Sequence, residues 1–169
     1  MNRLRPGFTL VEFILYLFMV GGLLTAAAAI LTSILQYQAK LESAREVDQN
    51  LRFVTGRITQ AVRNANSITV PTGGATSSRL TIVTPVASTN PTVFLSQSGT
   101  LYLKEGADAT TTLNNTAVFV EAIFRNLTPT GTSGIIQVMT TVSTSGTTLA
   151  SEFRFSQMAT SSAAIRYRP

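Results

Sequence analysis

The stretch that decides the fold is Gly7-Phe8-Thr9-Leu10-Val11-Glu12. It places one carboxylate, that of Glu12, at the start of an apolar run. Between Phe13 and Leu31, only Tyr16 carries an ionisable group. As a helix, this run extends roughly 28 Å, close to the thickness of bilayer hydrocarbon. A charge at the edge of such a span costs free energy unless it has a partner. The stretch therefore predicts a transmembrane helix in which Glu12 has a specific role.

A short basic leader precedes this helix, with Arg3 and Arg5 before Pro6. Positive charge on this side favours a cytoplasmic N-terminus and an exported remainder. Pro6 keeps the leader from joining the helix, and Gly7 allows an extended backbone without a side chain. We therefore expect a single-pass membrane protein whose main domain is periplasmic or extracellular.

From Arg3 to about Leu31 the chain resembles the class III signal peptide of type IV prepilins and type II secretion pseudopilins. The resemblance implies that a prepilin peptidase cleaves between Gly7 and Phe8 and methylates the new Phe8 amine. It also implies that Glu12 pairs with the Phe8 amine of a neighbouring subunit and sets the register of a filament. The implied partners are the peptidase, other pilin or pseudopilin subunits, an inner-membrane assembly platform and, before assembly, membrane lipid.

Two plainer interpretations of the apolar segment stay open. The first is an ordinary secretory signal cleaved near the small residues Ala26–Ala29. The second is a simple membrane anchor in which Glu12 is a tolerated edge charge. Sequencing the mature N-terminus separates them, since a start at Phe8 supports the pilin-type leader and a start near Ile30 excludes it.

After Leu31 the pattern becomes amphipathic without a proline before Pro71. It predicts one helix from about Thr9 to about Asn66, weakest at Gly21-Gly22 because glycine is a poor helix former. Asp48 and Arg52 stand four residues apart and predict an ion pair on its surface. We expect the second half to cover its own domain, with 36–48 the more exposed part. Pairing of this half with another subunit is the open alternative. The apolar positions recur every three or four residues: Leu41, Ala44, Val47, Leu51, Val54, Ile58, Ala61, Ala65 and Ile68.

The remainder alternates between β-branched runs and turn residues, which is typical of antiparallel strands. The predicted strands are 79–84, a hairpin of 92–96 with 100–104, one or two strands in 117–127, and a final pair of 135–142 with 152–156. Residues 158–169 have no clear pattern. The predicted fold is α+β: a long N-terminal helix packed on an antiparallel β-sheet head, as in pilins. The expected divisions are a leader (1–7), a transmembrane or filament-core helix (8–35), an amphipathic helix (36–67) and the head (68–169).

The order of these elements is similar to that of the J-type minor pseudopilins. The shared features are the helix end at Ile58–Ala65, the hairpin containing Gly99-Thr100-Leu101-Tyr102, and the final strand pair. This resemblance implies a minor pilin or pseudopilin. It leaves open whether the machine is a pilus, a secretion pseudopilus or a competence apparatus.

The composition argues against an enzyme. The 169 residues contain no cysteine and no histidine, so thiol chemistry and the commonest general base are absent. We predict no catalytic residues, no metal and no cofactor. Glu105 and Asp108 form the one close acidic pair of the head, which suits a solvated turn better than a calcium site. Asn114 and Asn126 begin sequons for N-glycosylation, a short motif that also arises by chance.

The formal net charge is +5, and removal of the leader leaves 11 basic and 8 acidic residues, or +3. This small excess of basic residues gives little support for nucleic-acid binding. Arg154, Arg166, Tyr167 and Arg168 make the one modest basic and aromatic group, which a DNA-uptake role would use. A membrane-tethered binding module, such as an adhesin tip or a DNA-uptake receptor, is therefore the alternative function.

Overall fold

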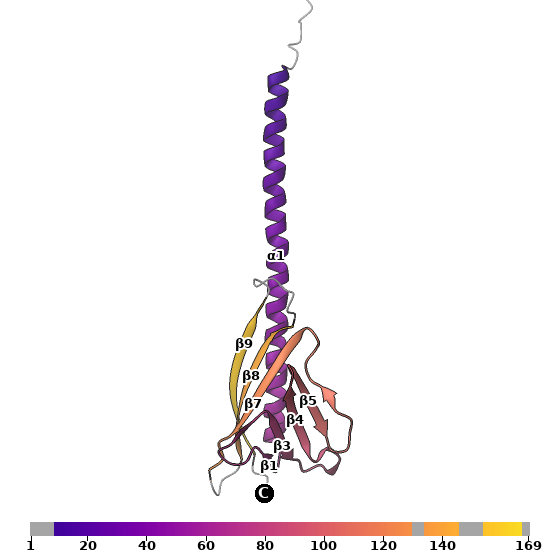
Figure 1. The fold of residues 1–169 in the computed structure, drawn as a ribbon, viewed down its shortest axis with the longest axis vertical. Coiled ribbons are helices and arrows are strands. Elements are labelled where there is room, and N and C mark those ends of the chain that lie inside the picture. The colour runs from indigo at the N-terminus through magenta and orange to yellow at the C-terminus, as the bar shows by residue number, and fades with distance from the viewer. Residues whose placement is uncertain (1–8, 130–133, 146–153, 167–169) are drawn as a thin grey trace, which may run out of the picture. The chain divides into compact units, whose positions relative to one another are not determined.

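The computed structural model describes residues 9–129, 134–145 and 154–166. They form one long helix, a short 3-10 turn and strands in two antiparallel sheets (Figure 1). This confirms the predicted α+β fold of a long N-terminal helix packed against antiparallel strands. The strands are divided between two sheets, a division that the sequence analysis did not address. The chain separates into two compact units, 1–41 and 42–169, which are described in turn.

Helix α1 extends over Leu10–Arg63 without interruption, including Gly21-Gly22. It ends three residues before the predicted Asn66. The reason is that the Asn66 backbone N–H leaves the helix and donates to the Val83 carbonyl at 2.7 Å. A backbone N–H that is hydrogen-bonded to a strand does not also require a carbonyl of the helix as its acceptor.

In the first unit, every described side chain from Thr9 to Leu41 is exposed. This part of α1 contains a segment long and apolar enough to cross a membrane, and none of that segment is buried. The apolar segment that the sequence predicted is therefore present, and no described residue of this unit covers it. Such a surface is unstable in water, because each large apolar side chain gains about 1.5–3 kcal/mol on burial.

The first sheet is built on the predicted hairpin, which is confirmed as β4 (Thr92–Gln97) and β5 (Thr100–Glu105). Ser98 and Gly99 both have positive φ, as a two-residue turn of this hand requires. The sheet has the order β1-β3-β4-β5-β6. Its other strands are β1 (Ser67–Val70), β3 (Arg79–Val83) and β6 (Thr111–Thr112), and the 3-10 turn η1 (Ala87–Thr89) precedes β4.

The second sheet has the order β2-β7-β8-β9, formed by β2 (Thr76–Ser77), β7 (Val118–Asn126), β8 (Ile135–Thr144) and β9 (Ser156–Ala164). The predicted partner of β8 at 152–156 was wrong. Arg154 and Phe155 precede the strand, while Glu152 and Phe153 lie outside the described residues. Most of the strand falls in the part of the tail that had no clear pattern, since nine residues pair with β8, from Ser156 opposite Ser143 to Ala164 opposite Ile135. A continuous ladder of backbone hydrogen bonds outweighs the weak strand preference of serine and alanine.

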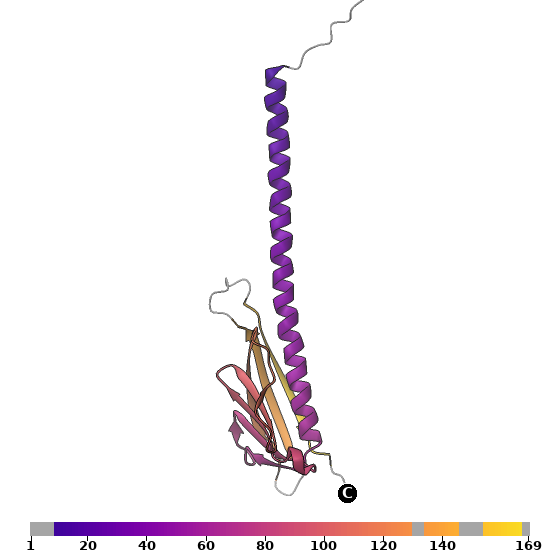
Figure 2. The ribbon, with the colours of Figure 1, turned by 90° about the vertical axis from the view of Figure 1, so that its right-hand side faces the viewer.

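The core of the second unit lies between α1 and both sheets (Figure 2). The prediction that the apolar stripe covers the head is correct from Val47 onward and wrong for Leu41, which is 56% exposed. The predicted exposed part, 36–48, is continuously exposed only as far as Glu42; Arg45 is exposed as well, but Val47 is completely buried. The buried set comprises Val47, Leu51, Val54, Ile58 and Val62 of α1, with Leu80, Ile82, Phe94, Leu101, Val120, Phe124, Ile136 and Val138 of the sheets.

The two sheets meet where β7 lies against the β4–β5 hairpin. The Val120 N–H donates to the Gly99 carbonyl at 2.8 Å, and the Ala122 N–H donates to the Ser96 hydroxyl at 3.0 Å. The hairpin turn is also covered by Phe119, since a Cβ on Gly99 would lie 2.6 Å from its ring. The edge strands are β1 and β6 in the first sheet and β2 and β9 in the second.

Candidate functional site

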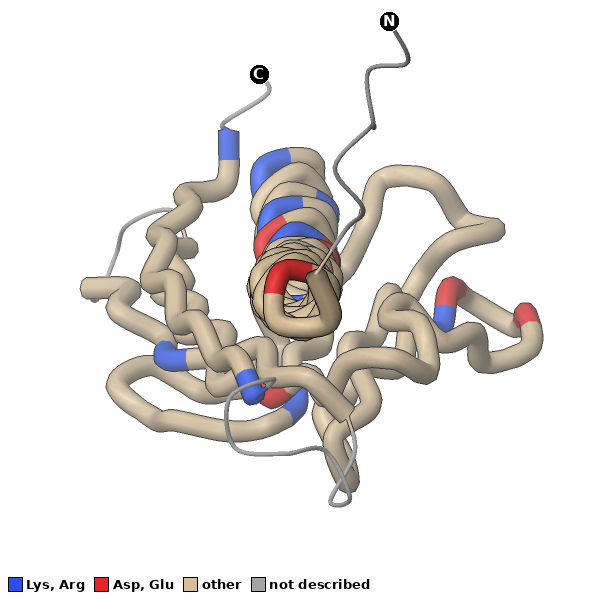
Figure 3. Tube along the Cα trace, turned by 90° about the horizontal axis from the view of Figure 1, so that it is seen from above, with Lys and Arg blue, Asp and Glu red and all other residues tan. Residues whose placement is uncertain are grey.

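The first turn of α1 contains a structural role for Glu12 that the sequence analysis missed. Thr9 lies directly before the helix, and its hydroxyl accepts a hydrogen bond from the Glu12 backbone N–H at 3.3 Å. Threonine followed three residues later by glutamate is the capping-box pattern, and it was readable in the sequence. Glu12 is also the acidic residue of the first turn, where the helix dipole favours a negative charge. Figure 3 shows the chain from above with the acidic positions in red. Part of the reason for glutamate at this position is therefore local.

The cap does not neutralise the charge of the Glu12 carboxylate, because it uses only the backbone N–H of this residue. The side chain is exposed, and no cation of the described part of the chain forms an ion pair with it. Gly7 and Phe8, the predicted cleavage and methylation site, lie outside the described residues. Cleavage between them and pairing of Glu12 with a Phe8 amine thus stay predictions.

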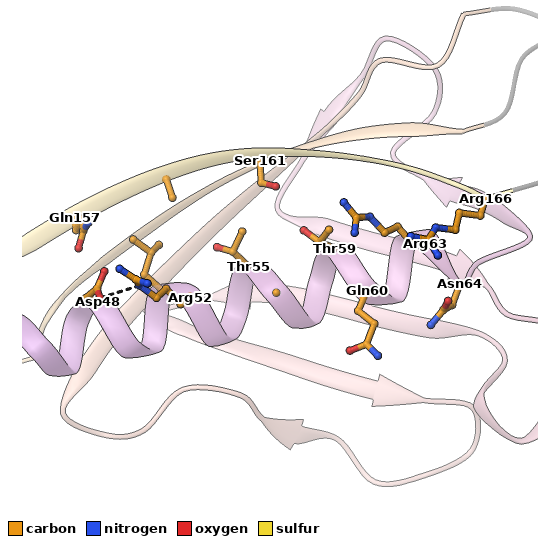
Figure 4. Close-up of a pocket in the computed structure, with 13 residues that line it drawn as sticks. Asp48, Arg52, Thr55, Thr59, Gln60, Arg63, Asn64, Gln157, Ser161 and Arg166 are labelled. Carbon is orange, nitrogen blue, oxygen red and sulfur yellow. Dashed lines mark ion pairs between the residues drawn. The ribbon is translucent and has the colours of Figure 1, made fainter.

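The second unit contains a groove of about 730 Å³ between α1 and β9 (Figure 4). Thr55 and Thr59 point from the helix toward β9, and Ser161 lies across from them on the strand. Gly56 and Ala159 also line the groove, and small side chains on both walls keep it open. Sequence reasoning missed this groove because it depends on the placement of β9.

The two ends of the groove differ in charge. At one end Arg52 and Asp48 form the predicted ion pair, with 2.9 Å between Nε and Oδ2. At the other end Arg63 and Arg166 lie together, since the Arg166 N–H donates to the Arg63 carbonyl at 3.3 Å. Over the described ranges, neither of these arginines has an ion-pair partner. The second end is therefore a small site of positive charge.

The predicted basic and aromatic group at the C-terminus is not brought together. Arg154 and Arg166 lie at opposite ends of the nine-residue strand β9, which separates them by about 30 Å of extended chain. Tyr167 and Arg168 lie outside the described residues. The partner of Arg166 is Arg63 instead, which comes from the end of a helix about a hundred positions earlier in the chain.

The acidic pair Glu105 and Asp108 forms a turn, as the sequence suggested. The Asp108 N–H donates to the Glu105 carbonyl at 3.0 Å, and Gly106 between them has a φ of +53°. Glu105 points toward α1, where its carboxylate is 3.3 Å from a guanidinium nitrogen of Arg57. No group of three or more potential metal ligands occurs in the portion of the chain that the structure covers.

Both sequon asparagines have structural roles. The Asn114 side chain accepts from the Leu101 N–H at 2.9 Å and donates to the Val118 carbonyl at 2.9 Å, which ties β5 to the start of β7. Asn126 is buried and donates to the Pro71 carbonyl at 2.8 Å. Its oxygen accepts from the backbone of Thr128 at 2.9 Å. Both amides are therefore hydrogen-bonded within the folded head.

Comparison with protein-family models, with curated proteins and with solved structures found no match for this chain.

Proposed function

We propose that the chain is a minor pilin or pseudopilin, a structural subunit of a type IV pilus-like or type II secretion filament. In this proposal a prepilin peptidase cleaves between Gly7 and Phe8 and methylates the new Phe8 amine. The subunit is held in the membrane by the first part of α1 until the assembly platform transfers it to the filament.

The observation that supports the proposal most is the uncovered apolar half of α1 with a single carboxylate in its first turn. Every described side chain before Glu42 is exposed, although most of them are apolar. Lipid can cover this surface before assembly, and the equivalent helices of other subunits can cover it afterwards. In a plain anchor Glu12 would serve only the local cap of the helix, whereas a subunit that must enter at one register can also use its charge.

In the proposed mechanism, the Glu12 carboxylate pairs with the Phe8 amine of the adjacent subunit. Inside a bundle of apolar helices the dielectric is low, so an unpaired charge is strongly destabilising and a matched pair offsets desolvation. Only one axial position brings the two groups together. The apolar side chains after Glu12 are then buried against neighbouring helices, and the stabilisation that they contribute does not depend on the register.

The cap allows an experiment that separates charge from helix formation. Glu12→Gln removes the charge but keeps a residue suited to the capping box, whereas Thr9→Ala removes the cap and keeps the charge. We expect Glu12→Gln to be cleaved normally and to be incorporated into filaments about tenfold less efficiently, since a buried amine would lack its partner. Thr9→Ala should be incorporated much like the wild type.

The measurements are N-terminal sequencing of the membrane-bound protein and quantification of the chain in sheared filaments. Gly7→Val serves as the uncleaved control and should keep the leader. If Glu12→Gln is incorporated as well as the wild type, Glu12 does not set the register. If the working protein retains residues 1–7, the filament proposal itself is wrong and a tethered binding module is favoured.

A further inference from the structure

We propose that the groove between α1 and β9 binds the β5–β6 turn of a second copy of this chain, with Asp108 held by Arg63 and Arg166. The inference deepens the filament proposal by naming a contact between neighbouring heads. It depends on the second unit alone.

The end of the groove that contains Arg63 and Arg166 is suited to bind an anion. Arg63 is the basic residue of the last helical turn, where the helix dipole favours it, but Arg166 adds a second positive charge next to it. Like charges at close range repel, and no carboxylate of the described residues offsets them. A carboxylate between the two guanidinium groups would be bound by charge-assisted hydrogen bonds.

One side chain that lines the groove also has a hydroxyl group without a hydrogen-bond partner among the residues described. Thr55 lines the groove, and its hydroxyl oxygen is buried and has no hydrogen-bond partner in the part of the molecule described. A threonine inside a helix usually satisfies its hydroxyl with a carbonyl one turn earlier. Because this oxygen is not accessible from the groove, a carbonyl or hydroxyl of an inserted segment reaches it only after the Thr55 side chain, which points toward β9 in Figure 4, rotates into the groove.

The β5–β6 turn has the shape and charge of the inserted segment. Asp108 is exposed, and it forms none of the ion pairs found in the described ranges. Its neighbours Ala107, Ala109 and Thr110 are exposed and small, which suits the middle of a groove whose lining there includes small residues of both walls, between larger polar side chains at its ends. Glu105 is not available for this role, since it is paired with Arg57.

Glu121 is another exposed head carboxylate without an ion pair among the residues described, and its position excludes it. It lies in the middle of β7 on the outer face of the second sheet, between Phe119 and Ile123. A carboxylate on a flat sheet face cannot reach the floor of a groove, whereas a turn at a sheet edge can. Of these two carboxylates, charge and shape therefore favour Asp108.

The two surfaces lie on different edges of the head, so the contact repeats from one copy to the next. The groove borders β9, an edge strand of the second sheet, and the turn joins β5 to β6, an edge strand of the first. β9 and β5 are on opposite sides of Figure 1. A contact between two different patches is heterologous and extends into an open chain or a ring. This is the kind of contact that a filament needs.

Cysteine cross-linking tests the proposal on the full-length chain in membranes, because the chain has no cysteine of its own. Asn64→Cys marks the groove and Ala109→Cys marks the turn, in two differently tagged copies that are co-expressed and mildly oxidised. We expect a cross-linked heterodimer of these two variants. The matched control replaces Ala109→Cys by Glu121→Cys, which is equally exposed, and should give little product.

Charge reversal then tests the assigned residues. Asp108→Lys in the copy with Ala109→Cys should lower the yield at least about fivefold, and Arg166→Glu in the other copy should restore most of it. A yield no higher than that of the Glu121→Cys control overturns the proposal, as does an undiminished yield after Asp108→Lys. A dominant product between two Ala109→Cys copies also overturns it, because it indicates a two-fold contact. Since the cross-link forms without cleavage at Gly7, its failure is separate from failure of the filament proposal.

Discussion

Truncation of Ile58 to alanine tests whether α1 holds the two sheets together. Ile58 is completely buried in the core of the second unit, at the middle of the stripe that faces both sheets. The change removes three buried carbon atoms, which costs about 2.4 kcal/mol at roughly 0.8 kcal/mol each. The cavity left behind adds to this, so we expect a loss of about 3–4 kcal/mol.

The expected shift in melting temperature follows from the size of the unit. Residues 42–169 form one compact unit, for which the unfolding entropy is about 0.27 kcal/mol/K at 2.1 cal/mol/K per residue. A loss of 3 kcal/mol therefore lowers the melting temperature by about 11 °C. The assay is thermal unfolding of the full chain in detergent micelles, followed by the far-ultraviolet circular dichroism of the strands.

Phe53→Ala is the matched control on the same helix. Phe53 is 55% exposed on the side away from the sheets, so its truncation should cost less than about 1 kcal/mol although more atoms are removed. The reasoning is refuted if the two variants unfold at the same temperature, or if Phe53→Ala is the less stable. Either result would mean that a different face of α1 covers the head.

Two further predictions concern the loops of the head. Gly106→Ala should destabilise the head by about 2 kcal/mol or more, because its φ is +53° and an added Cβ would lie 2.1 Å from the Ser88 carbonyl oxygen. Thermal unfolding measures this, and a melting temperature within 2 °C or so of the wild type would contradict the turn geometry. Asn126→Ala should cost about 2–4 kcal/mol, since it leaves the Pro71 carbonyl and the Thr128 N–H without partners. Urea unfolding of the micelle-bound chain checks this, and an unchanged midpoint would show that water replaces the amide.

Local patterns were sufficient for the elements whose hydrogen bonds or burial depend on near neighbours. The long helix follows from an apolar and then amphipathic sequence without proline, and α1 extends over Leu10–Arg63 accordingly. The β4–β5 hairpin follows from two alternating runs around Ser98-Gly99, which adopt the two positive φ values of a tight turn. The Asp48–Arg52 pair follows from helical spacing alone.

Local patterns failed where a distant segment decided the outcome. The run at 152–156 alternates better than the one that follows, yet β9 is Ser156–Ala164, because β8 offers a complementary ladder there. Leu41 continues the helical stripe by spacing but is exposed, since no element of its own unit covers it. Asn114 and Asn126 resemble glycan acceptors in sequence, and only the folded head shows that their amides are already in use.

By itself, the sequence determined the α+β class, the extent of the long helix and the uncovered apolar segment that begins beside Glu12. Each of these follows from the periodicity or composition of neighbouring residues. Only the tertiary structure decided the division into two sheets, the place of β9 and the meeting of Arg63 with Arg166. Those features depend on pairing between segments far apart in the chain, and a one-dimensional pattern does not specify which distant backbone groups satisfy one another.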